Sequence, residues 1–102
     1  MKAENLPVAC SLTDSELQQR RKEVLQQTKA AMTGMKETES GFVYQFSSAS
    51  EKITALANLI ALEHQCCPFL TFRLTVEPGE APVSLELSGP PGTKEFLMML
   101  FD

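Results

Sequence analysis

The chain has no tryptophan, one tyrosine and one histidine among its 102 residues. Any catalytic group that needs an imidazole must therefore use His64. Basic residues are also few: 9 Lys and Arg stand against 13 Asp and Glu, and the formal net charge is −4. Because nucleic-acid binding needs clustered positive charge, this balance indicates a protein without a nucleic-acid partner. The densest basic cluster, Arg20-Arg21-Lys22, is expected to lie on the solvated face of a helix.

Long apolar runs are absent too. No segment approaches the roughly 20 apolar residues that span a bilayer, and residues 1–7 lack the apolar core of a secretion signal. The three cysteines are an odd number, which does not suit a closed framework of disulfides. We therefore expect reduced thiols, no membrane partner and a cytoplasmic location.

What is present fits one globular domain. Hydrophobic residues make up 43% of the chain and charged residues 22%, which is an ordinary globular balance. A chain of this length has room for one core. We expect residues 1–12 to form an extended N-terminal lead-in and residues 13–102 to form a single α+β domain.

Helical spacing and end signals predict helices at about 13–32, 50–67 and 94–101. Thr13 with Glu16, and Ser48 with Glu51, have the spacing of capping boxes. Pro68 ends the second helix at Cys67, because the residue before a proline avoids helical geometry. Thr93 is expected to cap the third helix.

Alternation of apolar and polar residues predicts strands at about 35–38, 42–46, 70–76 and 83–88. Each pair of strands is joined by a short turn, and Gly41 is expected to supply an unusual backbone dihedral in the first turn. The order α-β-β-α-β-β-α predicts an α+β fold, a four-stranded antiparallel sheet with helices packed mainly on one face. The first strand is the least regular and is expected at an edge. The predicted core residues are Leu56, Ile60, Phe72, Leu74, Leu85 and Phe96.

The adjacent pair Cys66-Cys67 is the most unusual motif. Neighbours on an α-helix diverge by about 100°, so both cannot face one core stripe unless the helix unwinds at Pro68. Thiolates prefer soft ions such as zinc or a heavier thiophilic metal. The sequence therefore predicts a metal site formed by Cys10, Cys66 and Cys67, which His64 or Glu63 could complete.

Two other interpretations of the pair stay open. The cysteines could form a vicinal disulfide in a thiol redox protein, or they could simply pack in the core of a non-catalytic binding module. A catalytic Cys67–His64 dyad is disfavoured because the negative end of a helix dipole opposes a thiolate. The sequence thus favours a role other than catalysis.

The first predicted helix is long and mostly polar, with a narrow apolar stripe. The first predicted strand is a poorly patterned edge. Either surface could join two copies, so we expect a homodimer.

Several segments resemble one family of small bacterial proteins whose activity is not established. They are Ala9-Cys10-Ser11-Leu12, residues 62–72 around Cys66-Cys67-Pro68-Phe69-Leu70, and residues 87–90 and 92–97. The resemblance spans residues 7–100, and the family pattern includes a cysteine at the position of Cys10. It implies a bacterial cytosolic protein and favours thiol-based handling of metals. His64 departs from the basic or other polar residue of the relatives, which argues against His64 as a ligand or base.

Overall fold

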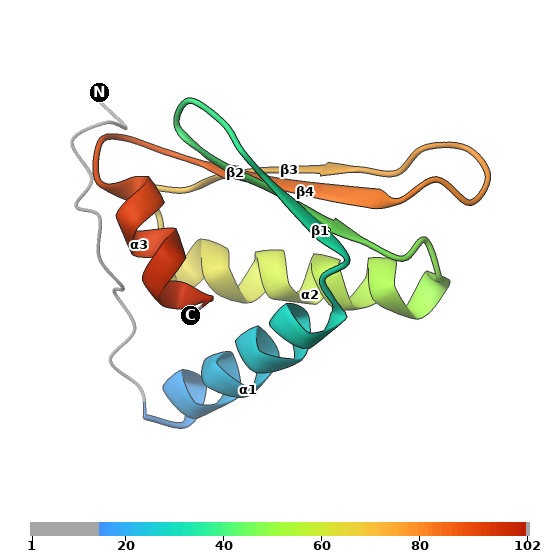
Figure 1. Cartoon of the computed structure of the whole chain (residues 1–102). Coiled ribbons are helices and arrows are strands. Elements are labelled where there is room, and N and C mark those ends of the chain that lie inside the picture. Colours follow the sequence, from blue (N-terminus) through green and yellow to red (C-terminus); the bar gives the residue numbers. More distant parts are fainter. Residues whose placement is uncertain (1–14, 102) are drawn as a thin grey trace.

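The computed structural model describes residues 15–101 and has seven elements in the predicted order (Figure 1). They are α1 (Ser15–Ala31), β1 (Gly34–Glu37), β2 (Gly41–Phe46), α2 (Ser50–Cys66), β3 (Thr71–Thr75), β4 (Val83–Ser88) and α3 (Thr93–Leu100). The α+β fold predicted from the sequence is confirmed. The predicted lead-in at 1–12 and the cap at Thr13 lie outside the described residues.

The four strands form one antiparallel sheet in the order β1-β2-β4-β3. β2 and β4 pair along their whole lengths, from Gly41 opposite Ser88 to Phe46 opposite Val83. Placing β1 at an edge is confirmed, and β3 forms the other edge.

The core lies between the sheet and the helices, which are on the same side of it in Figure 1. Alternate residues of the two central strands are buried on that side: Phe42, Tyr44, Phe46, Val83, Leu85 and Leu87. Among the predicted core residues, Leu56 and Leu85 are buried. The other four are partly buried and pack against the core: Ile60, Phe72, Leu74 and Phe96.

The predicted helix caps are wrong in detail. Ala49 is the N-cap of α2, and no described side chain caps it, so the box predicted from Ser48 and Glu51 does not form. Gly92 is the N-cap of α3 in a left-handed conformation (φ 98°), and the Thr93 hydroxyl donates instead to the Pro90 carbonyl at 2.6 Å. Turn geometry that the sequence does not reveal decides which residue occupies each cap.

Gly41 also differs from its prediction, because its backbone is not in the left-handed region. A Cβ atom built on Gly41 would overlap the carbonyl oxygen of Leu87 on β4. Glycine is needed here for the close approach of two strands.

Contacts between distant elements fix α3 and the turn after α2. Lys94 of α3 forms an ion pair with Glu37 of β1 at 2.8 Å. The Phe69 ring meets the Phe96 ring edge to face, with 5.1 Å between centroids.

None of the helices within residues 15–101 has the length and apolar character needed to cross a membrane.

Candidate functional site

The last turn of α2 gathers three possible metal donors on one side of the helix. Glu63 stands three residues before Cys66 and four residues before Cys67, and residues at these spacings are neighbours on a helix surface. Their donor atoms all lie within 4.8 Å of one another. Glu63 is 1% exposed and both cysteines are 0% exposed, so the cluster is enclosed by protein.

The end of α2 explains how two adjacent cysteines can both be buried. Cys67 is the C-cap residue, with φ −123° and ψ 75°, while its N–H still donates to the Glu63 carbonyl at 2.6 Å. After Pro68 the chain turns back, and the Leu70 N–H donates to the Cys67 carbonyl at 3.1 Å. The helix therefore ends at Cys67, just before the proline, while Cys67 keeps its helical hydrogen bond to Glu63.

Arg21 of α1 reaches this cluster from another helix. Its Nε donates to Glu63 Oε2 at 2.7 Å and its Nη2 donates to Oε1 at 3.1 Å. The Arg21 side chain is only 14% exposed. This bidentate contact is the strongest hydrogen-bonding geometry between an arginine and a carboxylate. It corrects the expectation that the whole cluster Arg20-Arg21-Lys22 is solvated.

The Cys67 thiol belongs to the same network. Its Sγ donates to Glu63 Oε1 at 3.5 Å and accepts from Arg21 Nη2 at 3.6 Å. Burial, and next the negative charge of Glu63, raise the pKa of Cys67 from 9.0 to about 12, although Arg21 opposes the shift. The sulfur is therefore a neutral thiol near pH 7, and an ion that binds it must displace a proton.

Cys66 differs from its neighbour in redox state. It is disulfide-bonded and does not titrate, whereas Cys67 is the free cysteine of the described part of the chain. The expectation of reduced thiols throughout is therefore wrong for Cys66, and the vicinal disulfide considered from the sequence is not formed. Cys10, the third predicted ligand, lies outside the described residues.

His64 is not brought to the cluster. Its side chain is exposed, and its ring lies 6.4 Å from the ring of Phe72. Of the two residues that could complete the site, the structure places Glu63 beside the cysteines and leaves His64 apart from them.

Sequence reasoning missed Arg21, yet one signal pointed to it. Glu63 falls among Leu59, Leu62 and Cys66 on the buried side of α2. A buried carboxylate needs a cationic or hydrogen-bonding partner. The first helix carries the densest basic cluster of the chain, Arg20-Arg21-Lys22, and could supply that partner.

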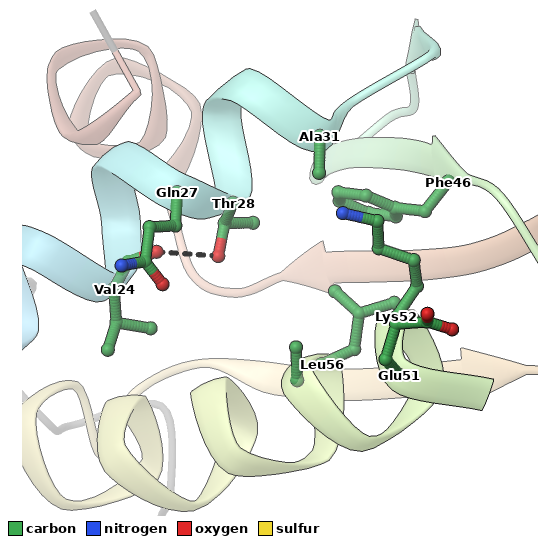
Figure 2. Close-up of a pocket in the computed structure, with 9 residues that line it drawn as sticks. Val24, Gln27, Thr28, Ala31, Phe46, Glu51, Lys52 and Leu56 are labelled. Carbon is green, nitrogen blue, oxygen red and sulfur yellow. Dashed lines mark hydrogen bonds between the residues drawn. The ribbon is translucent and has the colours of Figure 1, made fainter. Parts of the chain in front are cut away.

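A separate hollow of about 130 Å³ lies between α1 and α2, toward the other end of α2. Figure 2 shows Val24, Ala31, Phe46 and Leu56 around it, with Lys52 at its rim. The Thr28 hydroxyl is already used, because it donates to the Val24 carbonyl at 2.8 Å. This hollow contains no cysteine and is not part of the thiol cluster.

Comparisons with known proteins return no relative: no family model matches the chain, and neither a curated protein nor a solved structure matches it.

Proposed function

We propose that the protein binds a thiophilic metal ion through Cys66 and Cys67 in their reduced state. The observation that carries this proposal is the enclosed cluster in which Glu63, Cys66 and Cys67 present donor atoms within 4.8 Å of one another. Two sulfur–metal bonds of ~2.3 Å span at most ~4.6 Å, so one ion can join two donor atoms of this cluster with a shift of a few tenths of an ångström at most.

Soft-ligand chemistry supports the proposal. Two thiolates select soft ions over magnesium or calcium, which prefer oxygen ligands. The cluster is also enclosed, and a dry shell around a metal site strengthens its electrostatic interactions. These features point to ion binding and provide no nucleophile with a lowered pKa.

The redox state of Cys66 sets a condition on this function. A sulfur in a disulfide has no thiolate to offer, so the ion binds only after reduction. A cytoplasmic location suits this requirement because thiols persist there. The wider site with Cys10 is a further part of the proposal.

The test is an anaerobic titration of the reduced protein with Zn²⁺ and with Hg²⁺, followed by native mass spectrometry and thiolate-to-metal absorbance. We expect one ion per chain, and none when Cys66 stays in its disulfide. Cys66→Ala and Cys67→Ala should each remove stoichiometric binding. Cys10→Ala measures whether a third sulfur takes part.

The complete burial of both cysteines also favours a second candidate, a non-catalytic binding module in which they only pack. Reaction of the reduced protein with a small disulfide reagent separates the two. A packing role predicts two thiols that stay inert until denaturation and that no metal ion protects. Metal binding predicts that one equivalent of Hg²⁺ added to the folded protein stays bound through gel filtration and blocks both thiols when the protein is then denatured.

A further inference from the structure

The surface hollow beside β1 and α3 has an unpartnered polar group in its lining. The hollow measures about 440 Å³ and contains no cysteine, and small-molecule sites in proteins measure roughly 300–1,000 Å³. We infer that it binds a small uncharged molecule with an apolar body and one hydrogen-bond acceptor, to which the Tyr44 hydroxyl donates. This site is independent of the thiol cluster and of the function proposed above.

The Tyr44 hydroxyl is the first argument. Tyr44 is 2% exposed, and its hydroxyl forms no hydrogen bond within the described part of the chain. Burial alone therefore raises the pKa of this phenol. A polar group that is removed from water without a partner is costly. A ligand that supplies the missing acceptor explains why a tyrosine stands here.

The hydroxyl can be reached from the hollow. Within residues 15–101, the unpartnered side-chain oxygen that is completely enclosed belongs to Thr38, so the Tyr44 oxygen remains accessible from outside. Tyr44 lines the hollow, which provides the opening. Because so little of the tyrosine is exposed, a small group can reach its hydroxyl and a flat protein surface cannot.

The rest of the lining decides the chemistry of the ligand. Met35, Met98 and Phe101 contribute apolar side chains, and the flexible thioether of methionine adapts to the shape of an apolar body. Two lysines and two glutamates also line the hollow: Lys29, Glu37, Lys94 and Glu95. Lys94 and Glu37 already pair at 2.8 Å, and the other two charges have opposite signs. The lining thus carries no net charge, which favours an uncharged ligand because a buried unpaired charge is costly.

Three probes with the same naphthalene body test the inference: the ketone 2-acetylnaphthalene, the hydrocarbon 2-isopropylnaphthalene of similar shape, and the charged 2-naphthoate. Each is titrated into the full-length protein labelled with ¹³C-methyl methionine and followed by NMR. The ketone should saturate at one molecule per chain and shift the methyl signals of Met35 and Met98. Met99 is the internal control, because it is 79% exposed and does not line the hollow.

Tyr44→Phe is the decisive variant, and it removes no hydrogen bond of the described fold. It should lower the affinity for the ketone, relative to the hydrocarbon, by at least about threefold, which is the scale of one hydrogen bond. Thr38→Val is the matched control. It also removes an unpartnered hydroxyl, but Thr38 does not line the hollow, so the relative affinity should stay unchanged.

The inference is overturned if the ketone leaves the signals of Met35 and Met98 in place, or if Tyr44→Phe does not alter the relative affinity. Tighter binding of 2-naphthoate than of the ketone overturns the uncharged class. A probe affinity that falls as the protein concentration rises would show that a second copy of the chain fills the hollow instead. None of these results bears on the metal titration of the reduced cysteines, so the two proposals fail separately.

Discussion

Glu63 is the residue on which the thiol cluster depends. Its carboxylate accepts two hydrogen bonds from Arg21 and one from the Cys67 thiol. Because these groups share one buried acceptor, replacing any of them changes the surroundings of the others. The cysteine pair should therefore be studied together with Arg21 and Glu63.

The raised pKa of Cys67 predicts a loss of stability in alkaline solution. Its pKa is about 12 in the folded protein against an ordinary 9.0, because burial and then Glu63 disfavour the thiolate. An unfolded chain releases this proton from about pH 9 upward while the folded protein retains it. The contribution is thus complete below pH 9 and is lost as the pH rises toward 12. Burial raises the pKa of Tyr44 as well, and it acts in the same direction.

Urea unfolding between pH 8 and 10.5, without reductant, measures this effect. The free energy of unfolding should fall by up to about 1.4 kcal/mol per pH unit for each such group once its unfolded form titrates. Cys67→Ala should flatten the decline between pH 9 and 10, and Tyr44→Phe should flatten it above pH 10. An unchanged pH dependence in Cys67→Ala would show that its thiol is not held protonated.

At the scale of the elements, the ion pair between Arg21 of α1 and Glu63 of α2 holds these two helices together. Arg21→Met should lower the free energy of unfolding by about 3 kcal/mol, because it leaves a buried carboxylate without its partner. Urea denaturation checks the value. Arg20→Met is the matched control and should stay within about 0.5 kcal/mol, as is usual for an exposed position. A similar small loss in both variants would mean that the buried pair does not hold the helix.

The close approach of β2 and β4 gives another prediction. Gly41→Ala should cost at least about 2 kcal/mol, because the new methyl group overlaps a backbone oxygen that cannot move aside. Gly34→Ala in the neighbouring strand is the control. Its Cβ would meet only the side-chain oxygen of Gln45, at 2.6 Å, and a flexible side chain can turn away. Equal unfolding midpoints for the two variants would contradict this account.

Local signals predicted the elements well, and tertiary contacts decided the rest. Alternation in residues 83–88 suffices to place β4, since one face is buried and the other is not. Pro68 likewise fixes the end of α2 from sequence alone. The contact of Arg21 with Glu63 joins residues 42 apart, and no local pattern encodes it. The caps at Ala49 and Gly92 were missed for a different reason: the geometry of the turn just before each helix decides which residue is the cap.

At the scale of the whole molecule, the exposed apolar side chains are unevenly placed. Met35, Met98 and Met99 are 57%, 63% and 79% exposed, and they belong to β1 and α3. A hollow of about 440 Å³ lies on this surface, with Met35, Tyr44, Phe101 and Met98 among its lining residues. β1 is also an edge strand. Of the two surfaces considered for a homodimer, the edge strand β1 is thus better suited than α1, and the exposed methionines of α3 extend its apolar surface.

We therefore predict a homodimer that buries the surface formed by β1 and α3, since exposed apolar patches mark interaction sites and edge strands pair readily. Sedimentation velocity over a concentration series should show a dimer at high micromolar concentration. Met98→Glu should weaken self-association by at least about tenfold, or 1.4 kcal/mol, by burying a charge in the interface. Val76→Glu is the matched control, because Val76 is also exposed (51%) but follows β3 at the opposite edge of the sheet. A wild-type monomer at that concentration removes the homodimer, and a dimer disrupted by Val76→Glu alone moves it to the other edge.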